Sequence, residues 1–296
     1  MTVVSSEIII FCEGKQTSLD YKLLNQVVEN VIKKTTIVPV GSKFTFSPFI
    51  QGYFSQQSNK SGDINQKYIM FRDRDFDAKP TTDISLIPFQ SMLLTHRACV
   101  ENYLLNDELI HNYWHIKYME KQENPSSTWR YGDSPGIEAI SAWIREAAIS
   151  LQDYQTVRWA LADLLQSSTT RHQLKTTWTG GSGKLPSPLT LQDCKSQALI
   201  LIKQFQQAVE TVTQERLEES IAKYQQQFAQ EQFWKQKQYL IWFHGKDIQK
   251  AMHKNKPKYI PIKTKKGPDF FDWASDQLDI NHYPDLTELK NRISSL

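Results

Sequence analysis

Two apolar runs that end in carboxylates constrain this chain more than any other feature. Residues 6–12 are followed by Glu13, and residues 68–71 are followed by Asp73 and Asp75. Each run has the length and the apolar, aromatic content of a buried strand. In an open parallel sheet, the residues just past the carboxyl ends of the strands line the ligand crevice. We therefore expect Glu13, Asp73 and Asp75 to share one pocket, provided that the two strand ends lie side by side.

Clustered carboxylates indicate a cation. Three of them repel one another unless a hard divalent ion neutralises them, and oxygen ligation is what Mg²⁺ or Mn²⁺ prefers. This points to metal-assisted chemistry on phosphate. Each half of the pattern also has a plainer interpretation, because Glu13 and the glycine after it could form only a turn. Asp73 and Asp75 project the same way from an extended backbone, but they would also suit a solvated loop.

The first part of the chain alternates between strand and helix patterns, which predicts a compact α/β domain over residues 1–110. Ser18 is a suitable N-cap for the first helix, because its hydroxyl can accept from the free amides of the first turn. The expected strands are residues 6–12, 36–42, 68–71, 86–89 and 92–94, and the expected helices are residues 19–34 and a segment that begins at 49–53.

Beyond residue 110 the pattern becomes mainly helical. Residues 107–118, 137–165 and 191–243 have helical character, and the last of these carries an amphipathic face that could pack on its own core. Its final residues, 239–243, form an aromatic, apolar run that we interpret as a return strand. Two short helices, 269–278 and 286–293, close the chain. We thus expect a catalytic domain at 1–110, a helical insertion or partner region at 111–238, and residues 239–296 completing the catalytic domain.

Composition limits the function only broadly. The 296 residues are 40% hydrophobic and 23% charged, as in an ordinary soluble globular protein, and the net charge of +3 permits nucleic-acid binding without requiring it. Three scattered cysteines fit a reducing compartment, so we expect a cytoplasmic protein. No apolar run approaches membrane length, so we expect no membrane association.

A basic cluster at 250–259 is the best candidate for contact with a phosphate backbone. It contains Lys254, Lys256 and Lys258, and an electropositive patch of this kind is the usual footprint of nucleic-acid binding. A solvated lysine-rich loop explains the same residues equally well.

The motifs resemble a known domain family. Glu13, Gly14 and Lys15 after the first strand, with the Asp-Arg-Asp motif at 73–75, are similar to the TOPRIM domain of topoisomerases, primases and OLD-type nucleases. The segments 18–21, 39–42, 97–104 and 245–247 resemble one branch, a stand-alone TOPRIM-like family long catalogued as a domain of unknown function. Members of that branch are often encoded beside an ABC-type ATPase and include the nuclease effector of the PARIS anti-phage system. The resemblance covers most of residues 6–105 and a patch at 239–252.

The resemblance implies a role for each matching residue. Glu13 would be a metal ligand and general base, and Lys246 would stabilise negative charge on the scissile phosphate. Lys15 and Arg97 would be secondary phosphate contacts. The implied metal ligands are Glu13, Asp73 and Asp75, with Asp77 and Glu101 as further carboxylates. Asp77 could equally face the solvent, and Glu101 could be only a helix-start carboxylate that the helix dipole favours. One departure stands out, because many TOPRIM nucleases carry an acidic residue soon after Glu-Gly-Lys, where this chain has residues 16–18. Asp20 comes later, either as a substitute or in a site that holds one metal instead of two.

The expected function is that of a metal-dependent endonuclease that hydrolyses DNA or RNA, tRNA included. By the resemblance, it would be the toxic effector of an anti-phage system controlled by an ABC-type ATPase. The alternative is a non-catalytic TOPRIM module that docks on an ATPase or on nucleic acid. Homodimerisation through the long helical region is a further expectation.

Overall fold

The computed structural model of the chain describes residues 7–29, 31–42, 45–58, 67–167, 191–210, 212–262 and 269–296. These residues form an α/β fold with flanking helices, as the sequence predicts. Within the described residues, no helix has the length and the apolar character needed to cross a membrane.

The centre of the fold is a five-stranded mixed sheet with the strand order β2-β1-β3-β5-β4. Parallel pairing joins β1 to β2, β1 to β3 and β3 to β5, whereas β4 runs antiparallel to β5. Because β1 and β3 are parallel neighbours, their carboxyl ends meet at the same edge of the sheet. All five expected strands are confirmed: β1 (Ile8–Cys12), β2 (Thr35–Pro39), β3 (Lys67–Arg72), β4 (Ile87–Phe89) and β5 (Met92–Leu94).

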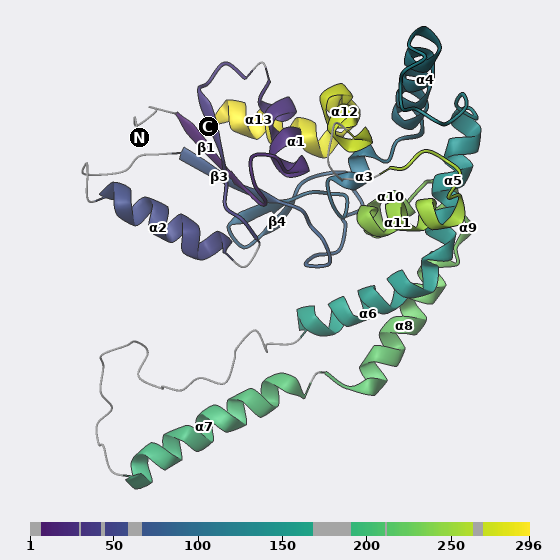
Figure 1. Ribbon diagram of the computed structural model, residues 1–296. Coiled ribbons are helices and arrows are strands. Elements are labelled where there is room, and N and C mark those ends of the chain that lie inside the picture. The colour runs from purple at the N-terminus through teal and green to yellow at the C-terminus, as the bar shows by residue number, and fades with distance from the viewer. Residues whose placement is uncertain are drawn as a thin grey trace. The chain divides into compact units, whose positions relative to one another are not determined.

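Helices cover both faces of this sheet (Figure 1). On one face, α2 (Phe46–Ser58) packs its apolar side chains against Ile9 and Phe11 of β1. On the other face lie α1 (Leu19–Val28), α12 (Phe270–Gln277) and α13 (Pro284–Ser295), and α1 contacts both of the other two. Every residue of β1 is therefore buried, as is usual for a strand in a two-sided parallel sheet.

The first helix begins where the sequence predicts and ends earlier. The Ser18 hydroxyl accepts a hydrogen bond from the Tyr21 amide at 3.4 Å, so the expected N-cap is confirmed. The helix stops at Val28, and the Glu29 amide donates to Asn25 O at 3.0 Å to satisfy the last turn.

The chain divides into two compact units, residues 1–152 with 231–296 and residues 153–230. Because α4 and α5 belong with the sheet, the unit boundary falls near residue 152 and not near residue 110. The first unit also contains α3 (Glu101–Leu104), α4 (Asp107–Glu123), α5 (Ile137–Ser150), α9 (Glu231–Lys235), α10 (Tyr239–Trp242), α11 (Gly245–Asn255) and the short 3-10 helix η1 (Ile280–His282).

The second unit is built from α6 (Gln152–Ser167), α7 (Leu191–Val209) and α8 (Gln214–Phe228). The carboxylate of Asp163 on α6 binds three side chains of α8: it accepts hydrogen bonds from Ser220 at 2.9 Å, Lys223 at 3.1 Å and Tyr224 at 2.8 Å. The helix expected over 137–165 is two helices, α5 and α6, which are separated at Leu151. The helix expected over 191–243 is divided among α7 to α10.

The return strand expected at 239–243 is wrong. This segment is helix α10, in which the Trp242 amide donates to Gln238 O and the Phe243 amide donates to Tyr239 O, both at 3.0 Å. Tyr239, Leu240 and Phe243 are buried, and their spacing places them on one side of a helical turn. A short apolar run fits either structure by pattern alone, and here the helical packing prevails.

Candidate metal and active site

The acidic residues are placed by the carboxyl ends of β1 and β3. Gly14 follows Glu13 with φ +85°, and a Cβ at this position would lie 2.5 Å from the Ser18 hydroxyl oxygen. Only glycine suits such a tight turn. The Gly14 amide donates to Gly41 O at 2.6 Å, and the Gly41 amide donates back to Gly14 O at 3.1 Å. The turn therefore directs the chain into α1, whose first turn carries Asp20.

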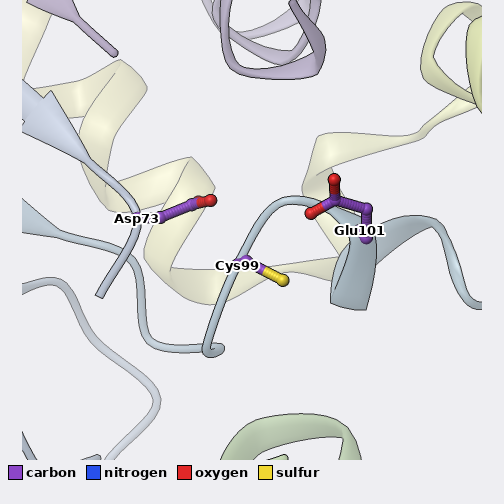
Figure 2. A group of neighbouring side chains, drawn as sticks. All are labelled: Asp73, Cys99 and Glu101. Atoms are coloured by element: carbon purple, nitrogen blue, oxygen red, sulfur yellow. The ribbon is translucent and has the colours of Figure 1, made fainter. Parts of the chain in front are cut away.

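Asp73, Cys99 and Glu101 form the centre of the site. Figure 2 shows Asp73 just past its strand, with Cys99 on the following loop and Glu101 at the start of α3. One ligand atom from each of the three residues lies within 4.8 Å of the other two. All three side chains are buried, so the two carboxylates face each other away from bulk water.

Three carboxylates at this site each have an oxygen without a hydrogen-bond partner. Among the residues that the structure describes, Asp20 Oδ1, Asp73 Oδ1 and Glu101 Oε2 are buried and lack a partner. Such orphaned acceptors are unusual in folded proteins, because a buried polar atom that loses water and gains nothing is costly. Asp73 and Glu101 lie in one group with Cys99, and Asp20 on α1 interacts with both through its charge.

The pKa values of two of these carboxyls are raised, which is a second sign that their charges lack compensation. Burial, together with the charges of Asp20 and Glu101, raises the pKa of the Asp73 carboxyl well above its usual range. Burial and the charges of Glu101 and Glu13 raise the pKa of Asp20 to about 7, although Lys246 opposes this. These carboxylates become compatible with full ionisation when a cation lies among them.

The donor set fits a hard divalent cation. Burial and the charges of Glu101 and Asp73 raise the pKa of the Cys99 thiol well above its usual range, and its sulfur donates to Asn102 Oδ1 at 3.0 Å. A protonated, hydrogen-bonded thiol is a poor metal ligand. The oxygens of Asp73 and Glu101 are therefore the ligands that this group offers, with the Asp20 carboxylate as a charged neighbour, and Mg²⁺ or Mn²⁺ is the type of ion that they suit.

A latch between α3 and α11 brings Lys246 to the carboxylates. Asn102 Oδ1 accepts hydrogen bonds from the amides of Cys99 at 3.1 Å and Gly245 at 2.9 Å, while its Nδ2 donates to Phe243 O at 2.9 Å. A Cβ on Gly245 would lie 2.8 Å from the Asn102 amide nitrogen, so the two helix starts touch backbone to backbone.

The latch sets the position of the Lys246 ammonium group. Its Nζ lies 3.6 Å from Glu101 Oε1, and the side chain remains about half exposed, at 53%. Although burial alone would lower the pKa of Lys246, the charges of Glu101 and Asp73 raise it above the usual range. Lys246 is thus a fixed positive charge between the buried carboxylates and the solvent.

Asp75 lies beside this centre and is held by His244. Asp75 has φ +50°, and its amide donates to Ala98 O at 2.7 Å. His244 Nε2 lies 3.1 Å from Asp75 Oδ1, and the imidazole ring stacks on Phe76 with 6.3 Å between the ring centroids. The negative charge of Asp75 also raises the pKa of Asp73. Asp75 therefore belongs to the same acidic region through its charge and through His244.

Two of the predicted ligands occupy other positions. Asp77 is buried against Arg72, whose guanidinium donates to its carboxylate at 2.6 Å, so it serves an ion pair and not the acidic centre. Glu13 is partly buried and lies near Asp20, whose pKa it raises. The group formed by Asp73, Cys99 and Glu101 does not include Glu13 among the described residues.

The predicted phosphate contacts divide in the same way. Lys15, Lys254 and Lys258 are exposed, whereas Lys256 lies 3.2 Å from Glu146 and over the Tyr259 ring. Three further lysines that follow the basic cluster, Lys263, Lys265 and Lys266, lie outside the described residues.

Arg97 is held inside the fold. Its guanidinium donates to Asn102 O at 2.6 Å and lies over the rings of Tyr103 and Tyr283, with 5.3 Å and 5.0 Å to the ring centroids. Asn102 is therefore held through its backbone carbonyl by Arg97 and through its side chain by the start of α11. In this structure Arg97 supports the start of α3.

Asn102 and His244 were missed by sequence reasoning, and Asp20 was only a candidate substitute. Both missed residues flank motifs that were recognised, since Asn102 follows Glu101 and His244 precedes the Gly-Lys pair. Asn102 acts through a contact with Gly245, 143 residues away, and His244 through a contact with Asp75, 169 residues away, so neither role has a local sequence signal.

The fold and the site together define an α/β protein with an acidic centre at the carboxyl edge of a mostly parallel sheet. A scan against models of known protein families finds no match for this chain, and a search of curated proteins finds no similar sequence. The geometry of the site is therefore the basis for any functional conclusion.

Proposed function

We propose that this chain is a Mg²⁺- or Mn²⁺-dependent nuclease of the TOPRIM type, which hydrolyses phosphodiester bonds in DNA or RNA. One observation carries the proposal: Asp20, Asp73 and Glu101 each keep a buried, unpartnered oxygen, and the charges of all three act on Lys246, whose Nζ lies 3.6 Å from Glu101 Oε1. An acidic centre beside a half-exposed cation suits a substrate that is itself a phosphate anion.

The side chains have separate tasks in this proposal. Asp73 and Glu101 hold the cation, with Asp20 as the carboxylate from α1 and Asp75 alongside. When bound, the divalent ion supplies positive charge to the phosphoryl oxygen and lowers the pKa of a water ligand. Lys246, whose ammonium stays protonated, binds a non-bridging phosphate oxygen from the solvent side and offsets the charge that develops there.

The finer assignment rests on the motifs. The resemblance to the TOPRIM-like branch supports an effector nuclease of an anti-phage system that an ABC-type ATPase controls. The alternative, a non-catalytic module, shares the fold but gives no reason for a lysine to lie 3.6 Å from a buried glutamate at an acidic centre.

The test is cleavage of plasmid DNA and of total tRNA by the purified chain in Mg²⁺, Mn²⁺ or EDTA. We expect metal-dependent cutting that falls at least about a hundredfold in Asp73→Asn and in Lys246→Ala. Exposed Asp83 offers a matched control, and Asp83→Asn should cut like the unaltered protein.

Calorimetric measurement of Mg²⁺ affinity distinguishes the two variants from each other, and it also distinguishes a nuclease from a non-catalytic module. Asp73→Asn should lose the ion, whereas Lys246→Ala should bind it at least as tightly, because a competing positive charge is gone. Cutting that persists in Asp73→Asn would assign the activity to a contaminant. A chain that neither binds the ion nor cuts would contradict the proposal in favour of a non-catalytic module.

A further inference from the structure

A row of lysines runs along α11 away from the acidic centre. Lys246, Lys250 and Lys254 follow one another at intervals of four residues and are all exposed. Residues four apart lie on the same side of a helix, so the three ammonium groups form one ridge. The opposite side of α11 is buried against α5 and α3, and it carries Gly245, Ile248, Ala251 and Met252.

The packing of α11 fixes the direction of this ridge. The Trp143 indole of α5 donates to Met252 O at 2.7 Å, and the Asn102 latch holds the first turn. Rotation of α11 about its axis would break both contacts. The lysine side is therefore held toward solvent, and the first lysine of the ridge is the one that reaches Glu101.

The spacing of the ridge suits a phosphate backbone. With a rise of about 1.5 Å per residue, lysines four apart are separated by about 6 Å along the axis, close to the distance between neighbouring phosphates of one strand. The whole ridge is about 12 Å long. The amino end of α11 adds the positive end of its helix dipole at the same edge as the acidic centre.

The remaining lysines of the basic cluster are less suited to this role. Lys256 is engaged with Glu146, and Lys258 lies beyond the end of the helix at Asn255. Lys250, by contrast, lies midway between Lys246 and Lys254 on the exposed side. The cluster predicted from the sequence thus separates into a ridge on α11 and lysines outside it.

We infer that the α11 ridge binds the backbone of a single nucleic-acid strand and leads it to the acidic centre. This inference rests on the proposed nuclease function and deepens it. Lysine contacts to successive phosphates carry no base information, so the binding is independent of sequence. The preferred substrate is a polynucleotide strand with several consecutive phosphates, and the scissile bond lies at the Lys246 end.

Binding is measured without cleavage, in EDTA, with labelled 20-nucleotide single strands of DNA and RNA over a range of KCl concentrations. The test variant is Lys250→Gln with Lys254→Gln. The control is Lys34→Gln with Lys235→Gln. It removes the same charge from two exposed lysines, one directly before β2 and one at the end of α9. All four substitutions are on the surface and should leave the fold intact.

Each phosphate contact adds about 0.7 to the salt dependence of single-strand affinity, so the ridge variant should lower the slope of log Kd against log salt by about 1.4. Its affinity at low salt should fall at least about tenfold, and the control should keep the original slope. In cleavage assays with Mg²⁺, the ridge variant should raise KM more than it lowers kcat. A stronger effect on RNA than on DNA, or the reverse, would identify the preferred strand.

Equal losses in the ridge variant and the control would show a response to net charge alone and overturn the inference. An unchanged slope in the ridge variant would overturn it as well, even if cleavage by the unaltered protein upheld the nuclease function. Conversely, strands that bind with the expected slopes but are never cut would leave the ridge in place and remove the nuclease proposal.

Discussion

At the scale of single residues, the acidic centre is an arrangement that folding alone would disfavour. Burying a carboxylate oxygen without a hydrogen-bond partner costs free energy, and Asp73 and Glu101 each bury one such oxygen. The raised pKa of Asp73 and Asp20 is the measurable sign of that cost. We therefore expect the metal-free protein to be less stable than its fold would otherwise allow.

The first prediction is a pH dependence of the metal-free protein. The pKa of Asp20 is about 7 in the folded chain, against an ordinary value of 3.8, so the native state binds its proton more tightly than the unfolded state. The resulting stability is present at low pH and is lost as the pH rises through about 7. Urea unfolding in EDTA should give a free energy of unfolding at pH 5.5 that exceeds the pH 8 value by about 1 kcal/mol or more.

Asp20→Asn should weaken this dependence, because one of the two carboxyls of this centre with a raised pKa is gone. Exposed Asp83→Asn should leave it unchanged. A free energy of unfolding that increases from pH 5.5 to pH 8 in the unaltered protein would count against the ionisation scheme.

The second prediction separates Asp77 from Asp73. Asp77→Asn weakens a buried ion pair with Arg72 and should lower the free energy of unfolding by about 3 kcal/mol, while leaving Mg²⁺ affinity intact. Asp73→Asn removes repulsion and should leave the metal-free protein as stable or more stable, while Mg²⁺ binding is lost. Urea unfolding in EDTA and calorimetry with Mg²⁺ measure the two quantities. The reverse pattern would place Asp77 in the metal site.

At the scale of elements, the contact between α3 and α11 decides whether the site is assembled. The third prediction concerns Gly245→Ala, whose Cβ would meet backbone and side-chain atoms of Asn102 at 2.8 Å and 2.9 Å. Since backbone cannot yield as a flexible side chain can, we expect a loss of about 1–3 kcal/mol and displacement of Lys246.

Gly52→Ala on α2 is the matched control. No atom lies within 4 Å of the added methyl group there, so alanine should stabilise the helix by about 0.5–1 kcal/mol. Urea unfolding and cleavage rate together test the latch. If the Gly245→Ala protein were active and as stable as the unaltered protein, the close contact between α3 and α11 would not be needed for the site, and the prediction would be wrong.

The sequence predicts the sheet well because its signals are local. Apolar runs with carboxylates at their ends identify β1 and β3, and their parallel pairing brings Asp73 to the edge as expected. The α10 segment was mispredicted as a strand, since a run of aromatic and aliphatic residues as short as 239–243 fits the period of a helix and that of a strand equally well. Asp77 pairs with Arg72, and the positive φ of Asp75 interrupts the extended backbone between Asp73 and Asp77, which no local pattern indicates. Asn102 acts only through a partner far along the chain.

At the scale of the whole molecule, metal binding and stability are one equilibrium. The fourth prediction is that Mg²⁺ or Mn²⁺ at about a hundred times its Kd stabilises the protein by about 2.7 kcal/mol and raises Tm by about 5–10 °C. Hydrogen exchange should slow in α1, α3 and α11, which carry the site. Asp73→Asn should show neither effect, and a Tm that rises equally in that variant would indicate binding elsewhere.

The distance along the chain between Glu101 and Lys246 has a consequence for biosynthesis. The carboxylates are made first, and the ribosome needs on the order of 10 s to reach the lysine and the glycine that the latch requires. Until then, the nascent chain has the acidic residues but not the Lys246 ammonium group that lies beside them in the folded protein. Under the proposed function, translation that stops between these residues leaves a fragment that cannot cut nucleic acid.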